Sequence, residues 1–142
     1  MQLPNGTATE EHWNTTSSIN HQPYSYSKTI AEKEAWKINK AQNRWDLVVI
    51  NPSLVIGPGI NPKSTSESFN IVRQIGDGSV KTGVPGFEFG LVDVRDLGIA
   101  HYRAGFIPEA NGRHIISADR KPLLELAQIL KAKYGNTYPI PN

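Results

Sequence analysis

The hydrophobic and polar positions of the chain follow two different periods, one typical of helices and one typical of buried strands. Between Tyr24 and about Asn43 the apolar residues recur with the 3.6-residue period of an amphipathic helix, and Pro23 stands where a helix tolerates proline. The run "LVVI" (residues 47–50) is short, continuous and β-branched, as expected for a strand buried on both faces of a parallel sheet. The prolines of "NPSLVIGPG" (residues 51–59) predict an ordered loop after that strand.

The remaining pattern continues this alternation. Residues 1–23 are polar and turn-rich, which predicts a loop or arm, and residues 24–142 hold the regular elements. Asp93 is placed to cap a helix. Further helices are predicted at residues 65–76, 93–106 and 121–135, and further strands at residues 89–94 and 112–117. This order predicts an α/β fold with a mostly parallel sheet and flanking helices.

Composition narrows the classes of function. The chain has 142 residues, enough for one domain, and a formal net charge of +2 with interleaved acids and bases, which argues against a nucleic-acid surface. It has no cysteine, so disulfide and thiolate chemistry are excluded. No apolar run approaches the roughly 18 residues of a membrane span, and the first residues lack the features of a signal peptide, so we expect a cytoplasmic protein. The four histidines are scattered, so no metal site is expected.

The predicted first helix carries candidate chemistry. Tyr24 and Lys28 share one stripe with Ala31, Ala35 and Ile38, which predicts that this face is turned towards protein, while the charged residues Glu32, Lys33, Glu34, Lys37 and Lys40 are expected on the opposite side. A free tyrosine has a pKa near 10, and an ammonium group one helical turn away favours the phenolate. Such a pair suits general acid–base catalysis, although the spacing alone favours a surface aromatic beside a solvated lysine. Tyr26, offset by about 200° from Tyr24, is expected to be structural.

Three motifs in order identify a family resemblance: "YSYSKTIAEKEAW" (residues 24–36), "VVINPSLVIGPG" (48–59) and "GLVDVRDLGIAHYRA" (90–104). Together they closely resemble the extended short-chain dehydrogenases/reductases, and within them the branch of dihydroflavonol reductases, cinnamoyl-CoA reductases and fungal aldehyde/ketone reductases. The likeness runs from about residue 9 to the C-terminus. It implies the C-terminal part of a Rossmann-like NAD(P)-binding fold.

The resemblance also implies roles for individual residues. Tyr24 resembles the catalytic tyrosine that gives a proton to the substrate carbonyl oxygen, and Lys28 resembles the lysine that binds the nicotinamide ribose hydroxyls. Pro52, Ser53 and Val55 resemble the cofactor-binding segment that lies against the nicotinamide end. The family resemblance favours NADP(H) as cofactor and an aldehyde or ketone as the small-molecule substrate. Loops at residues 58–68 and 81–90 are expected to form much of the substrate pocket.

Parts of the family pattern are not found in the chain. A glycine-rich dinucleotide-binding unit needs about 30 residues, and only 23 precede Tyr24. Ser17 and Ser18 are too close to Tyr24 to replace the serine or threonine of the family's active site. We therefore expect a truncated reductase, inactive or nearly so by itself, with little cofactor binding of its own.

An incomplete sheet would have an unprotected edge, so we expect self-association or pairing with a complementary N-terminal half. Two other functions stay open. One is a nucleotide-sugar epimerase or dehydratase, which uses the same tyrosine–lysine pair. The other is a non-catalytic interaction module derived from the same fold.

Overall fold

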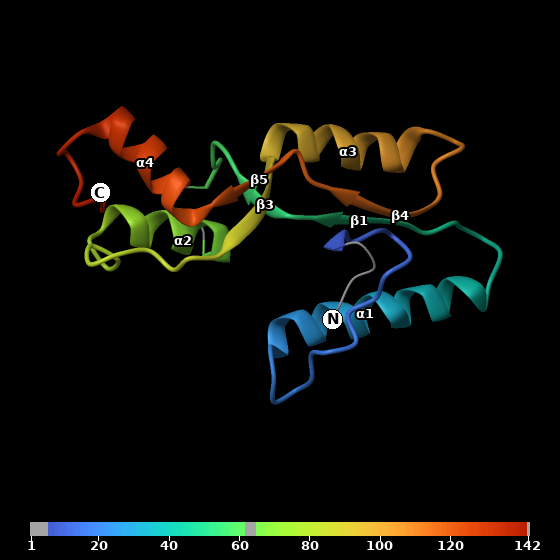
Figure 1. The fold of residues 1–142 in the computed structure, drawn as a ribbon. Helices are drawn as coiled ribbons and strands as arrows, with labels where there is room; N and C mark the ends of the chain where they lie inside the picture. Colours follow the sequence, from blue (N-terminus) through green and yellow to red (C-terminus); the bar gives the residue numbers. More distant parts are fainter. Residues whose placement is uncertain (1–5, 62–64, 142) are drawn as a thin grey trace. The chain divides into compact units, whose positions relative to one another are not determined.

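The computed structural model describes residues 6–61 and 65–141, so residues 1–5 of the predicted arm lie outside it. The chain groups into two compact units. Of the described residues, 6–51 and 100–115 form the first unit, and 52–61, 65–99 and 116–141 form the second. Figure 1 gives the order of the elements along the chain.

The first unit is built around helix α1 (Pro23–Lys40) and a pair of strands, β1 (Val48–Pro52) and β4 (Gly112–Ile116), which are hydrogen-bonded neighbours. It also includes the second part of helix α3 (Val94–Phe106). Pro23 stands at the first position of α1, as predicted, because the first helical N–H groups need no intrahelical partner.

The described residues before α1 have neither a long helix nor a strand. Apart from a 3₁₀ position at Gly6, they contain turns, bends and one bridge, between Ser18 and His21.

The buried side of α1 differs from the prediction. Its half-buried residues are Ser25, Tyr26, Thr29, Glu32, Ala35, Trp36 and Asn39. Tyr24 is 71% exposed and Ile38 is 53% exposed. The expectation that the Tyr24 face is turned towards protein is therefore wrong for the part of the chain that the structure describes. The cause is that α1 packs through a different side, on which Glu32 meets Arg113 of β4.

The second unit contains a three-stranded sheet in the order β2–β3–β5 among its described residues. Strands β2 (Leu54–Ile56) and β3 (Glu88–Asp93) are parallel, with Leu54 opposite Leu91. Strand β5 (Asp119–Pro122) is antiparallel to β3, with Glu88 opposite Pro122. The sheet is thus mixed, and its antiparallel strand was not predicted.

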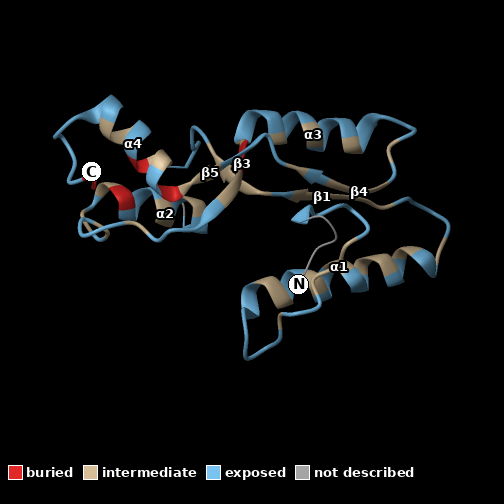
Figure 2. Cartoon of the chain, in the orientation of Figure 1, coloured by how far each residue is buried: buried red, intermediate tan, exposed pale blue. Residues whose placement is uncertain are grey.

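Helices α2 (Glu67–Gly76) and α4 (Leu123–Tyr134) enclose the core of the second unit. This core consists of Ile75, Leu123, Ala127 and Ile140, which are at most 6% exposed. Figure 2 shows the buried segments on α2, α4 and the C-terminal segment. Leu91 and Val92 of β3 are also buried. Most of these positions are the apolar residues of predicted elements, so this part of the core follows directly from the sequence pattern.

Two strands correct the sequence interpretation. Residues 54–56 form β2 and not a loop, because they pair with residues 91–93 of β3. Pro52 and Pro58 lie outside the paired residues, so neither proline removes a hydrogen bond from this pairing. Strand β5 was missed because its sequence "DRKP" has no apolar alternation. Arg120 of β5 forms an ion pair with Glu88 of β3, which is the charged edge expected of an exposed strand.

The predicted cap of α3 is present. The backbone N–H of Arg95 donates to Asp93 Oδ1 at 2.8 Å, and the Arg95 side chain donates to both carboxylate oxygens of Asp93. These hydrogen bonds lower the pKa of Asp93 to about 2.

Candidate functional site

Tyr24 and Lys28 meet at the beginning of α1. The Lys28 Nζ atom lies 5.4 Å from the centroid of the Tyr24 ring. The four-residue spacing therefore brings the two side chains to one face, as predicted. Both side chains are exposed, so small molecules can reach them.

These two residues line a cavity of about 420 Å³ in the first unit. That volume lies in the range of small-molecule sites. Eight other residues line the cavity, and six of them are of polar or charged type. They come from the arm, α1 and the two strands: Trp13, Asn14, Ser25, Thr29, Glu32, Val49, Asn51 and Arg113. The arrangement provides an ammonium, a phenol and two hydroxyl groups around one cavity.

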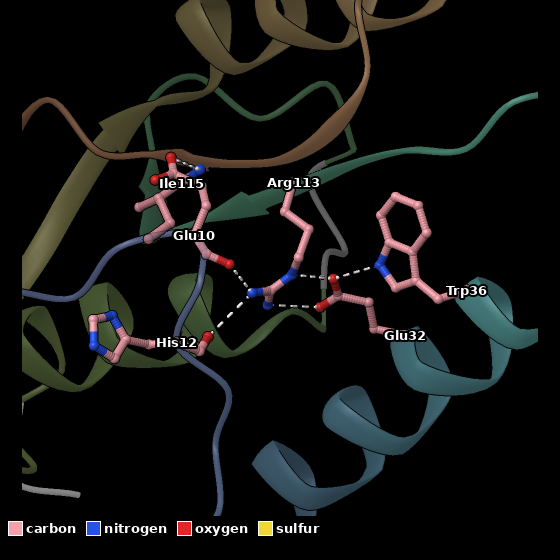
Figure 3. Close-up of polar contacts among 6 residues, drawn as sticks. All are labelled: Glu10, His12, Glu32, Trp36, Arg113 and Ile115. Carbon is pink, nitrogen blue, oxygen red and sulfur yellow. Dashed lines mark hydrogen bonds and ion pairs between the residues drawn. The ribbon is translucent and has the colours of Figure 1, made fainter.

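An ion pair forms part of this lining, as Figure 3 shows. Arg113 of β4 donates from Nε to Glu32 Oε1 at 2.6 Å and from Nη2 to Glu32 Oε2 at 3.2 Å. The Trp36 indole also donates to Glu32 Oε1, at 3.2 Å. Burial raises the pKa of Glu32, but the hydrogen bonds from Arg113 and Trp36 and the charge of Arg113 outweigh it. The net effect is a pKa below the ordinary value, so Glu32 is ionised.

Arg113 also contacts the segment before α1. Its Nη1 donates to the backbone oxygens of Glu10 and His12, the latter at 3.1 Å. Its guanidinium carbon lies 4.0 Å from the centroid of the Trp13 ring, a cation–π contact. The side chain of Glu10 in turn accepts a hydrogen bond from the Ile115 backbone N–H at 3.0 Å. The arm is therefore attached to β4 at several points.

The sequence interpretation missed Glu32 and Arg113. Glu32 was expected on the solvated side of the helix, yet its side chain is only 12% exposed, and that expectation is wrong. A signal was available, because eight residues place Glu32 about 80° from Tyr24 around the helix, beside its stripe and not opposite it. Nothing in the local sequence indicates Arg113, which is separated from Glu32 by 81 residues.

The other predicted site residues belong to the second unit. Pro52 is exposed, and Ser53 and Val55 are half-buried. Ser53 is held by the backbone oxygen of Ile116, which accepts from Ser53 N at 3.0 Å and from Ser53 Oγ at 3.3 Å.

Val55 lines a cavity of about 510 Å³ in the second unit, together with Phe69 and Leu126. One of the loops expected to form the substrate pocket, residues 58–68, includes residues 62–64, which lie outside the described part.

Residues 6–61 and 65–141 contain no group of three or more histidine, aspartate or glutamate side chains that could hold a metal ion. None of their helices combines the length and the apolar character needed to cross a membrane.

Comparison with known proteins relates the chain to a family described as NAD dependent and to proteins named as reductases. The profile of the NAD dependent epimerase/dehydratase family matches residues 3–110. Tetraketide alpha-pyrone reductase 2 of Arabidopsis thaliana is 40% identical over 119 residues, which are 84% of this chain and 36% of that protein. Cinnamoyl-CoA reductase 2 of Medicago truncatula is 37% identical over 118 residues, which are 83% of this chain and 34% of that protein. The chain thus spans about a third of the length of these relatives.

Two solved structures also resemble this chain. Gre2 of Candida albicans, in complex with NADPH, is 30% identical with a TM-score of 0.75, and the match covers 93% of this chain and 43% of that one. Vestitone reductase from alfalfa is 28% identical with a TM-score of 0.67, over 83% of this chain and 37% of that one.

The chain has a Rossmann-like NAD(P)-binding fold, and the relatives and solved structures described above include several reductases. The chain belongs to the NAD dependent epimerase/dehydratase family, the extended short-chain dehydrogenases/reductases, in the branch of cinnamoyl-CoA and dihydroflavonol reductases. The predicted fold class and family are confirmed.

Proposed function

We propose that this chain supplies the proton-transfer residues of an NADP(H)-dependent carbonyl reductase, which converts an aldehyde or ketone into an alcohol. The observation that carries the proposal is the contact of Lys28 with Tyr24 beside a cavity of about 420 Å³. A reductase is favoured over an epimerase because relatives 36–40% identical to the chain are reductases by name.

In this proposal Tyr24 donates the proton that the carbonyl oxygen needs, and bound NADPH supplies the hydride. Lys28 would bind the ribose hydroxyls of the cofactor, and its positive charge is complementary to the negative charge left on Tyr24 after proton transfer. The cavity lining suits the ribose of such a cofactor, because the exposed Lys28 ammonium and the hydroxyls of Ser25 and Thr29 can hydrogen-bond to a sugar. Pro52, Ser53 and Val55 would contact the nicotinamide end, on the strength of the family resemblance.

We also propose that the chain works in association with itself or with a complementary N-terminal half. No described residue of the first unit is fully buried, and the second unit contains the whole buried core. Exposed aromatic residues on α3 support the proposal, since Tyr102 is 65% exposed and Phe106 is 74% exposed. A partner that covers these surfaces would supply the burial that the first unit lacks.

The test joins this chain to the N-terminal part of Medicago truncatula cinnamoyl-CoA reductase 2, and also assays the chain alone. NADPH oxidation is followed by absorbance with a panel of aldehydes, ketones and acyl thioesters, and NADPH binding is titrated by fluorescence. Tyr24→Phe should lower kcat of the fusion about 10²–10⁴-fold without abolishing NADPH binding. The matched control is Tyr26→Phe, which should keep kcat within about twofold.

A Tyr24→Phe fusion with undiminished turnover would refute the proposed role. A fusion that binds no NADPH at millimolar concentration would favour the non-catalytic interaction module.

A further inference from the structure

Arg113 connects three separate segments of the first unit. It lies on β4, binds the carboxylate of Glu32 on α1, and donates to the backbone oxygens of Glu10 and His12 in the arm. Its guanidinium group also stacks on the Trp13 ring. Figure 3 shows the polar contacts converging on this one side chain.

The Arg113–Glu32 ion pair is largely shielded from water. The side chains of Arg113 and Glu32 are only 17% and 12% exposed, so water does not compete strongly for their hydrogen bonds. The planar fork of arginine allows two parallel bonds to one carboxylate while the third nitrogen serves the arm. Lysine carries the same charge but has neither the fork nor the stacking plane.

The same contacts fix the lining of the candidate site. Trp13 and Asn14 line the cavity that also contains Tyr24 and Lys28. Glu32 stands one helical turn beyond Lys28 on the same helix. Arg113 therefore holds one part of the cavity lining, the arm, against another, the helix that carries the candidate proton donor.

We propose that Arg113, through Glu32 and the Glu10–Trp13 segment, is a positioning residue for the Tyr24–Lys28 site. This inference rests on the proposed function of that site. In this role Arg113 contacts neither substrate nor cofactor. Arg113 sets the position of the arm relative to α1.

The experiment uses the absence of cysteine, which allows two spin labels to be attached at chosen positions. The sites are Glu11→Cys in the arm and Ala31→Cys on α1, both exposed. Electron–electron resonance should give a narrow distance distribution in the otherwise native chain. Arg113→Lys should broaden it at least twofold, because the charge stays but the fork and the stacking are lost.

A second readout reports on the site itself. In ¹³C-tyrosine NMR, the resonance that Tyr24→Phe removes should move in Arg113→Lys. The matched control is Arg95→Lys, which loses a comparable fork to Asp93 in the second unit. It should leave both the distance distribution and the Tyr24 resonance unchanged.

Each outcome either supports or overturns the positioning role of Arg113. A narrow distribution in Arg113→Lys, or a broad one with an unmoved Tyr24 resonance, would overturn the positioning role. If circular dichroism shows that Arg113→Lys is unfolded, Glu32→Gln replaces it, since this variant keeps the size of the side chain and should give the same two changes. No readout requires turnover, so a failed reductase assay and a failed positioning role are distinguished.

Discussion

Gly57 should not tolerate even the smallest side chain. It follows β2 with φ +124°, a backbone conformation that residues with a Cβ rarely adopt. A Cβ there would lie 2.9 Å from Val94 Cγ1 and 3.2 Å from Asp93 Oδ1. The second of these atoms caps α3 by accepting from the Arg95 N–H. Gly57→Ala would therefore strain the backbone and press on the cap at once.

The expected loss can be worked from these two effects. A residue held in a sparsely populated backbone region costs about 1–3 kcal/mol. Weakening an N-terminal cap costs about 1 kcal/mol more. We expect Gly57→Ala to lower the free energy of unfolding by about 2–4 kcal/mol. With a urea dependence of about 2 kcal/mol per M, the midpoint should fall by about 1–2 M.

The control is the same substitution at Gly98, in the interior of α3, where a Cβ would meet nothing within 4 Å. Gly98→Ala should raise stability by about 1 kcal/mol, since alanine is the better helix former. Urea unfolding of both variants is followed by far-ultraviolet circular dichroism. A Gly57→Ala midpoint equal to or above that of the native chain would refute the reasoning.

Three further predictions concern the core, the pH dependence and the exposed surface. Ile75→Ala, at a position 1% exposed, should cost about 2–5 kcal/mol in urea unfolding, whereas Ile129→Ala, at a position 52% exposed, should cost less than about 0.5 kcal/mol. The pKa of Asp93 is about 2 in the folded chain against an ordinary value of 3.8, so its stabilising effect is present above pH 3.8 and is lost as pH falls towards 2. Asp93→Asn should flatten this part of the urea-midpoint profile; an unchanged slope would contradict the assignment. Light scattering should show the native chain above monomer mass and Phe106→Glu closer to it; a native chain that is monomeric at all concentrations would refute the association.

The sequence predicted the helices well because their signals are local. Pro23 marks the start of α1, and Gly135, with φ +58°, follows α4 as a C-terminal glycine should. The strands were harder, because pairing partners are distant in sequence. Strand β2 becomes a strand only through β3, more than 30 residues later, and the charged edge strand β5 carries no apolar pattern.

The sequence also predicted only the local contact of the candidate site and missed the distant one. The Tyr24–Lys28 contact follows from a four-residue spacing within one helix, so the sequence was sufficient to predict it. The Glu32–Arg113 ion pair joins α1 to β4, and no local pattern reports such a contact. The exposure of the Tyr24 face likewise depends on which stripe of α1 meets β4, a choice that periodicity alone did not decide.

The division of the described chain into two units has a consequence for its evolution and for protein engineering. The backbone passes between the units three times, and each passage falls inside a regular element: β1, α3 and β4. No single recombination event or proteolytic cut can therefore release either unit as a continuous polypeptide. Gene fragments exchanged with relatives must carry both units together, and insertions should be tolerated first in exposed connections such as residues 107–111.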